Sequence, residues 1–368
     1  MPDAPTAVAI GGDELPRAAE VVIVGGGFAG AATAWALAEA GLGDVVVLER
    51  EARCGQHASG RNAALCRQLA DDDATTELTV RGAAFLREPP PGFAAGPLVA
   101  RTGSILTADD EAGVATLAAR AAAHGIAHER VGIAEVVARW PLLAGLRAAG
   151  GLYFPGDGVI DVVALLDGYL AGARAGGARV VTGCELLAAG PRRGGVILET
   201  ARGPLEADLV VDAAGAWAGV VGGRLDAADH RFTHVKRHLF TSRPIAVTAN
   251  APYVWHLGVE QIYVRPAGAG LLLSHCDGRG VEPADVDADP DAADRLADRI
   301  RALAPSLEGV AVERAWACLR TFTPDHHFRI GWDRDLPWLF WVAGLGGHGA
   351  TASAAVGIAA AAGVVERL

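Results

Sequence analysis

Cysteine is scarce in this 368-residue chain, which has five: Cys54, Cys66, Cys184, Cys276 and Cys318. They are scattered and form no C-x-x-C pair, so they provide neither a disulfide framework nor the ligand spacing of a zinc site. An odd number of isolated thiols suits a reducing compartment. We therefore expect a cytoplasmic protein without a metal centre.

Positive charge is also scarce. The chain has 32 Lys and Arg against 43 Asp and Glu, which gives a net charge of −11 at pH 7 with neutral histidines. No basic run is long enough to reverse this balance locally. Because nucleic-acid binding depends largely on contacts between basic side chains and phosphates, we expect no nucleic-acid partner.

Long apolar runs are missing as well. The best membrane candidate, Ala350–Val365, is uncharged but mostly Ala and Gly, and it is shorter than the roughly 20 residues that a span needs. We expect a tightly packed internal helix there, and not an integral membrane protein. Residues 1–20 contain acidic residues and prolines in place of the basic and apolar segments of an export signal, and we expect them to form an N-terminal tail.

Apolar residues are nevertheless abundant, at 51% of the chain against 20% charged residues. Such a composition excludes general disorder and supplies material for folded cores. A chain of this length exceeds the usual domain of about 100–200 residues. The sequence therefore predicts two domains, or one large α/β domain with an insertion.

A strand–helix–strand unit opens the chain. Glu20–Val24 reads as a buried strand, Ala31–Ala40 as a helix, and Val45–Leu48 as a second strand that runs into Glu49. Further helices are expected at Thr75–Arg87, Glu111–His124, Asp161–Ala175 and after the acidic segment Asp285–Asp298. Further strands are expected at Arg179–Thr182, Leu209–Val211, His234–Ser242, Gln261–Arg265, Gly270–Ser274 and Trp338–Val342.

Gly25, Gly27 and Gly30 form a G-x-G-x-x-G motif between the first strand and the helix, and Glu49 follows 19 residues after Gly30. In this context the pattern predicts a dinucleotide site. Gly25 makes the turn, Gly27 lets the backbone approach a pyrophosphate, and Gly30 lets helix pack on strand. Glu49 can accept hydrogen bonds from ribose hydroxyls and would repel a 2′-phosphate, which disfavours NADP. The motif alone does not choose between FAD and NAD.

Several ordered blocks of the chain resemble a known family. They are VVIVGGGFAG (21–30), GQHASGRNAA (55–64), VVDAAGAW (210–217), QIYVRP (261–266), WACLRTFTPDHHFRIG (316–331) and FWVAGLGGHGATAS (340–353). From about Val21 to the C-terminus the chain is similar to the FAD-dependent amine and amino-acid oxidoreductases of the D-amino acid oxidase type. That group includes glycine oxidase, monomeric sarcosine oxidase and bacterial D-arginine dehydrogenases.

The resemblance implies an α/β fold, with α+β character in a second domain: a Rossmann-like FAD-binding domain interrupted by a β-rich substrate domain. The expected FAD-binding segments are 21–88, 157–222 and 313–368. The expected substrate-binding segments are 89–156 and 223–312.

The resemblance also implies which residues contact FAD, in addition to the glycine motif and Glu49. Leu186 falls where a backbone contacts adenine, and His348 falls at the start of a last helix whose N-terminus faces the flavin. The remaining expected cofactor residues are Phe28, Ala29, Arg50, Ser59, Arg61, Asn62, Ala63, Ala214, Gly215, Trp217, Gly346, Gly347, Gly349, Ala350 and Thr351.

Arg320, Tyr263 and His348 are the catalytic candidates that the resemblance implies. Arg320 matches the arginine that holds the substrate carboxylate, a role that suits a guanidinium fork; the alternative is a structural ion pair. Tyr263 matches the tyrosine that closes over the substrate, or it is an ordinary half-buried strand residue. For Arg265, Lys236, Arg237 and His238, added positive potential and a structural role are both open. His57, His326 and His327 are expected on the surface or in packing.

Three positions depart from single branches of the family. Cys318 lies where a small residue is usual beside Arg320, yet in the sarcosine oxidase branch a cysteine here is bonded to the flavin. We expect noncovalent FAD, with Cys318 as the minority candidate for attachment. Thr351 replaces the carboxylate-binding lysine of that same branch. Cys66 lies where related dehydrogenases carry an aromatic residue, which implies a different pocket wall.

These features predict oxidation of the C–N bond of a small amino acid or N-substituted amino acid to an imino acid, with O2 or a quinone as the final electron acceptor. Two alternatives remain open: a flavoprotein subunit of a hetero-oligomeric dehydrogenase, and a tailoring oxidase that acts on a secondary amine within a larger metabolite. The sequence leaves the substrate's identity and the oligomeric state open.

Overall fold

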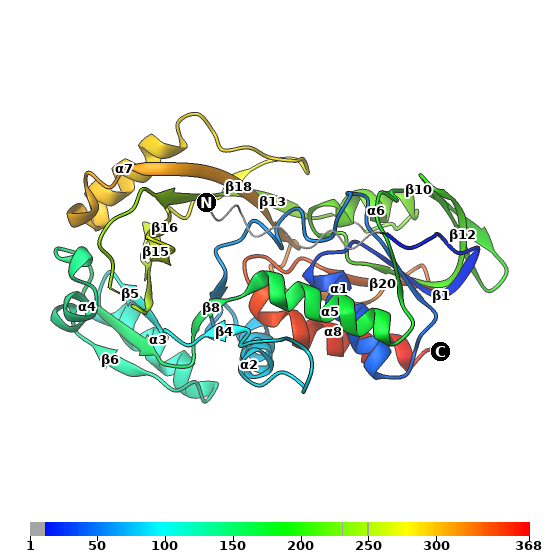
Figure 1. The fold of residues 1–368 in the computed structure, drawn as a ribbon, viewed down its shortest axis with the longest axis horizontal. Coiled ribbons are helices and arrows are strands. Elements are labelled where there is room, and N and C mark those ends of the chain that lie inside the picture. Colours follow the sequence, from blue (N-terminus) through cyan, green and yellow to red (C-terminus); the bar gives the residue numbers. More distant parts are fainter. Residues whose placement is uncertain (1–11, 230, 249) are drawn as a thin grey trace.

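The computed structural model describes residues 12–229, 231–248 and 250–368, in which two large sheets lie side by side (Figure 1). Within these ranges the first sheet has eight strands: β1 Ala18–Val24, β2 Val45–Leu48, β9 Arg179–Val181, β10 Leu186–Arg192, β11 Gly195–Thr200, β12 Gly203–Asp212, β19 Arg329–Trp332 and β20 Leu339–Ala343. Its centre, in the order β20–β12–β1–β2–β9, is parallel. The predicted α/β class with a Rossmann-like sheet is confirmed.

The opening unit follows the prediction with shifted ends. β1 begins at Ala18, α1 spans Phe28–Glu39, and β2 is Val45–Leu48 as predicted. α1 starts three residues before the predicted Ala31, directly after the glycine loop. Residues 1–11 of the expected N-terminal tail lie outside the described residues. Asp13, which the sequence places in this tail, is attached to the first sheet, because its backbone N–H donates to the carbonyl of Val180 in β9 at 2.9 Å.

Helices cover both faces of this sheet. α1, α2 (Asp73–Arg87), α5 (Val162–Ala175) and α8 (Gly349–Val365) pack on one face, and α6 (Ala218–Arg224) packs on the other (Figure 1). A Cβ on Gly357 of α8 would lie 2.4 Å from the carbonyl oxygen of Ala32 in α1. The Ala/Gly-rich segment is therefore the tightly packed internal helix that the sequence predicts. Within the described ranges, no helix is long and apolar enough to cross a membrane.

The second sheet is mainly antiparallel, with nine strands in the described part of the chain: β5 Ser104–Ala108, β6 Glu129–Val131, β7 Gly150–Phe154, β13 Thr233–Ser242, β14 Tyr253–Leu257, β15 Gln261–Ala267, β16 Gly270–Ser274, β17 Arg279–Gly280 and β18 Val312–Phe322. Three helices accompany it: α3 Glu111–Ala123, α4 Ile133–Arg139 and α7 Ala292–Leu303. A small third sheet joins β3 Leu65–Cys66, β4 Val99–Ala100 and β8 Gly158–Ile160.

The long strand β18 connects the two parts of the molecule. All of it except Val312 lies within 313–368, which the sequence assigns to the FAD-binding domain, yet it pairs with β13 of the second sheet over its whole length (Figure 1). The loop after β18 then leads back to β19 and β20 in the first sheet. Residues near the end of β18 are thereby placed where the two sheets meet. The division of the chain into domains stays a prediction.

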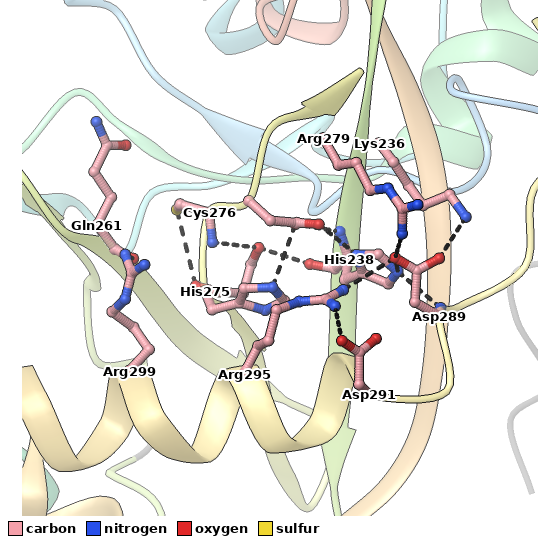
Figure 2. A network of polar contacts seen from close by, with 12 residues as sticks. Lys236, His238, Gln261, His275, Cys276, Arg279, Asp289, Asp291, Arg295 and Arg299 are labelled. Atoms are coloured by element: carbon pink, nitrogen blue, oxygen red, sulfur yellow. Dashed lines mark hydrogen bonds and ion pairs between the residues drawn. The ribbon is translucent and has the colours of Figure 1, made fainter. Parts of the chain in front are cut away.

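Behind β13, a polar network fixes the segment that precedes α7 (Figure 2). The backbone N–H of Asp289 donates to Nε2 of His238 at 2.9 Å, so Nδ1 of His238 carries the proton and donates to Asp277 at 2.5 Å. Oxygens of Asp289 also accept from Lys236 and Arg295. His238, His275 and Asp277 bring three potential metal ligands within 4.8 Å. Hydrogen bonds engage both ring nitrogens of His238, so this histidine holds the segment before α7 in place and has no nitrogen free for a metal.

Candidate functional site

The glycine motif lies where β1 passes close to the end of β12. Gly25 has φ +111°, a left-handed conformation, and a Cβ there would lie 2.5 Å from the carbonyl oxygen of Ala213. A Cβ on Gly30 would lie 1.9 Å from the carbonyl oxygen of Gly25. Both positions therefore require glycine. Gly30 acts in helix packing, as expected, and lines neither of the cavities described below.

The N-terminus of α1 faces this loop. Gly27 is the N-cap residue and has no side chain with which to cap the helix, while the N–H of Phe28 donates to Oγ of Ser59 at 2.9 Å. A Cβ on Gly27 would lie 3.0 Å from the same Oγ. Ser59 thus lies against the positive end of the helix dipole, which is a favourable place for a phosphate.

Glu49 is held at the end of β2, 9% exposed. Its carboxylate accepts hydrogen bonds from the backbone N–H groups of Gly26 and Glu51, each at 2.9 Å. Burial raises the pKa of Glu49, whereas these two hydrogen bonds act to lower it. Glu49 and Arg50 line the same cavity. The guanidinium of Arg50 stacks 3.8 Å from the ring centroid of Trp217, which lines this cavity too.

Two adjoining cavities lie beside the glycine loop. The first cavity is lined by one group of the predicted cofactor residues, namely Gly25, Gly27, Glu49, Arg50, Ser59, Arg61, Leu186, Ala214, Gly215 and Trp217. The second cavity is lined by the others except Gly30: Phe28, Ala29, Asn62, Ala63, Gly346, Gly347, His348, Gly349, Ala350 and Thr351. Gly27, Ser59 and Gly215 are shared between the two. The cavities form one path along the ends of β1 and β12, and glycines and a helix N-terminus line it. An extended dinucleotide fits this donor set.

The loop before α8 forms part of the wall of the second cavity. Gly346 has φ +53°, and a Cβ on Gly347 would lie 2.8 Å from the Cζ atom of Arg320. His348 is the N-cap residue of α8. Burial, together with the nearby charge of Arg67, lowers the pKa of His348 to about 3. The imidazole is therefore neutral at physiological pH.

Arg320 and Tyr263 reach the second cavity from the second sheet, on β18 and β15. Among the described residues, no hydrogen bond or ion pair engages the guanidinium of Arg320. Burial lowers the pKa of Arg320, and the charge of Arg237 lowers it further. Tyr263 is 1% exposed, and burial raises its pKa to about 12, so its phenol keeps its proton. The structure thus brings the catalytic candidates Arg320, Tyr263 and His348 into one cavity.

Sequence reasoning gave too little weight to other residues of this site. Arg237 lines the second cavity, whereas its neighbours Lys236 and His238 belong to the network behind β13. Arg67 and Trp255 line it too, with the Arg67 guanidinium 4.6 Å from the Trp255 ring centroid. Arg67 follows a two-residue strand and forms no motif, so the sequence carries no signal for it.

The structure also places Cys66, Arg265 and the three histidines that the sequence left without a site role. Cys66 is fully buried and lines neither cavity, so its side chain forms no part of the pocket wall in this chain. Arg265 braces a loop of the second cavity by donating to the carbonyl of Ala63 at 2.8 Å. His57 packs 4.5 Å from the Trp217 ring centroid and also lines the first cavity, while His326 and His327 are exposed as expected.

Curated relatives with similar sequences carry related names. Mouse sarcosine dehydrogenase is 26% identical over 91% of this chain, and mouse dimethylglycine dehydrogenase is 30% identical over 69%. The chain spans 38% and 30% of the length of these two proteins. Glycine oxidase of Bacillus licheniformis is 25% identical over 51% of the chain and 49% of its own length.

Solved structures share the fold. Glycine oxidase of Geobacillus kaustophilus superposes with a TM-score of 0.83 at 23% identity, and the match covers 95% of each chain. L-proline dehydrogenase of P. horikoshii has the same TM-score at 21% identity, with 94% of this chain and 93% of the other covered. The profile of one family, FAD dependent oxidoreductase, matches residues 20–362. Nearly the whole chain, with its glycine motif, cavity path and last helix, thus belongs to the family of FAD-dependent oxidoreductases of the D-amino acid oxidase type, as the sequence predicts.

Proposed function

We propose that this protein oxidises the C–N bond of a small amino acid or N-substituted amino acid and uses FAD as the electron acceptor. The observation that carries the proposal is Arg320, a guanidinium without a carboxylate partner that lines the second cavity beside the N-terminus of α8. A half-buried arginine fork without a partner suits an incoming carboxylate, which it can bind through two parallel hydrogen bonds.

The residues of the first cavity would hold the adenosine and pyrophosphate of FAD. Gly25 and Gly27 allow close approach of the backbone, and Glu49 presents a fixed acceptor for ribose hydroxyls. The N-terminus of α8 would face the flavin, and FAD, when bound, supplies the two-electron redox chemistry. Noncovalent attachment and the individual contacts remain proposals.

The chain's own residues prepare the substrate. Arg320 would fix the carboxylate and thereby the orientation of the neighbouring Cα–H bond. Arg67, Arg237 and Arg320 all line the second cavity, and their charges disfavour a protonated ammonium in it, since like charges oppose the charged form. A neutral amine has the lone pair that C–N oxidation requires. Tyr263, protonated with a pKa near 12, can donate a hydrogen bond.

The test compares substrates with and without a carboxylate in Arg320→Ala. Removing a charge-assisted bidentate contact in a partly desolvated site should cost about 2–4 kcal/mol, or roughly 30- to 1,000-fold in kcat/KM for amino acids. Amines without a carboxylate should lose much less. Arg314→Ala, which removes an exposed arginine from the same strand, is the matched control. Equal losses on both substrate classes would make Arg320 a structural residue.

Anaerobic bleaching of the purified yellow protein by D-, L- and N-methyl amino acids would identify the substrate class directly. Indifference to every free amino acid, with bleaching by a larger secondary amine, would favour the tailoring oxidase. Purification as a stable, active, homogeneous chain would count against the hetero-oligomeric subunit. Cytoplasmic location and the choice between O2 and a quinone stay predictions.

A further inference from the structure

Arg237 is a second guanidinium without a partner, and it lies on the cavity face of β13. Side chains alternate along a strand, so Arg237 and Leu239 face the second cavity while Lys236 and His238 face the network of Figure 2. Arg237 is 7% exposed, and its Nε and Nη1 atoms are buried without a hydrogen-bond partner. Leaving such a charge unpaired is costly, which points to an anion that is brought by a ligand.

No side chain of the protein supplies that anion within the described residues. Both oxygens of Asp277 accept from His238, one from its backbone N–H and one from its ring. Both oxygens of Asp289 are engaged by Lys236 and Arg295 (Figure 2). No Asp or Glu of the described chain lines the second cavity. Arg67, the third arginine there, already has Asp71 as its partner at 3.0 Å.

Arg237 and Arg320 are close but not interchangeable. Arg237 lies opposite Cys318 across the β13–β18 pair, and Arg320 is two residues further along β18 on the same face. Such diagonal neighbours are about 7 Å apart at Cβ. A carboxylate held by the fork of Arg320 has both oxygens engaged in the plane of that guanidinium, so the fork of Arg237 is free to bind a different part of the same molecule.

We propose that the substrate is an amino acid with a second carboxylate, and that Arg237 is the residue that binds it. The ligand class is an aspartate- or glutamate-like amino diacid, free or N-substituted. Two negative charges on a substrate with a neutral amine match the two arginines that the protein leaves without partners. This inference rests on the proposed function for the role of Arg320, and it adds a specificity subsite to that function.

The first arm of the test compares each diacid with its amide, aspartate with asparagine and glutamate with glutamine, as both enantiomers and N-methylated. The amides keep the size of the side chain and lose one charge. We expect the holoenzyme to favour the diacid by at least about 30-fold in kcat/KM, the range for a charge-assisted contact. Equal or better turnover of the amides would overturn the proposal.

The second arm compares Arg237→Gln with Arg314→Gln, a matched control that removes the same charge from an exposed position on β18. In Arg237→Gln the diacid-to-amide ratio should fall to within about threefold of unity, and in Arg314→Gln it should stay as in the wild type. If Arg237→Gln lowers kcat/KM for diacid and amide by the same factor, Arg237 is a structural residue and the subsite is wrong.

The third arm measures binding without turnover. Succinate and succinamate are titrated into the wild-type holoenzyme, and flavin absorbance and melting temperature are recorded. Succinate should bind at least about 10-fold more tightly, even if Arg237→Gln does not fold; equal affinities would contradict the subsite. Tight succinate binding without bleaching by any amino acid would leave the anion subsite standing and refute the proposed oxidation.

Discussion

The Oγ atom of Ser59 accepts a hydrogen bond at 2.9 Å from the backbone N–H of Phe28, 31 residues earlier in the chain. This contact fastens the segment after β2 to the first turn of α1, at the junction of the two cavities. A residue of the GQHASGRNAA block thus contacts the glycine motif although the two are distant in sequence, and both line the proposed FAD site.

Replacement of Ser59 by alanine should weaken FAD binding. The change removes one hydrogen bond at the helix N-terminus, worth about 1 kcal/mol, which is roughly a fivefold rise in Kd. Titration of the apoprotein with FAD by flavin fluorescence measures it. Ser306→Ala, which removes an exposed hydroxyl bonded to the carbonyl of Leu142, should leave Kd unchanged. An unchanged Kd in Ser59→Ala would show that the hydroxyl does not contribute to the site.

A valine at Gly27 should prevent flavin binding. Its Cβ already approaches Ser59 at 3.0 Å, and the branched side chain would fill the path through which backbone must approach a pyrophosphate. The purified variant should be colourless, with far-UV circular dichroism of the folded protein. Gly190→Val is the control, because nothing lies within 4 Å of a Cβ at that strand position. Full flavin content in Gly27→Val would refute the site.

FAD should be released on acid precipitation. Cys318 lines both cavities, but burial raises the pKa of its thiol, and a protonated thiol is a poor nucleophile for attack on the flavin. The supernatant should therefore be yellow. A yellow pellet would contradict this prediction. If the pellet became colourless in Cys318→Ser but stayed yellow in Cys66→Ser, a control whose thiol lies outside both cavities, a covalent bond between Cys318 and the flavin would be established.

The pH dependence of stability should include a contribution from His275. Burial lowers its pKa to about 4, against about 6.5 in an unfolded chain. As the pH falls from 6.5 to 4, the unfolded state takes up a proton that the folded state does not, so stability falls by up to about 1.4 kcal/mol per pH unit.

Both ring nitrogens of His275 are buried without hydrogen-bond partners, and Nε2 lies 3.7 Å from a carboxylate oxygen of Asp277. His275→Leu should therefore lose that slope without losing a hydrogen bond. Urea unfolding at several pH values between 4 and 7 measures the slope. His327→Gln, an exposed histidine, should behave as the wild type. A slope in His275→Leu equal to that of the wild type would mean that His275 titrates normally.

The local parts of this protein were readable from its sequence. The β1–α1–β2 unit, the glycine motif and Glu49 depend on near neighbours, so periodicity and spacing predict them, with errors of a few residues at the ends. Arg320 was readable only through its resemblance to a family motif. Its position beside Gly347 depends on β18 crossing from the second sheet toward the last helix.

Only the tertiary structure decided which basic residues line the second cavity. Lys236, Arg237 and His238 are adjacent in sequence, and the period of a strand fixes only that the middle one faces away from its neighbours. Pairing with β18, far along the chain, turns Arg237 toward the cavity and leaves Lys236 and His238 to Asp289 and Asp277. Long-range register sets such a choice, because a shift of one residue would move every side chain to the other face.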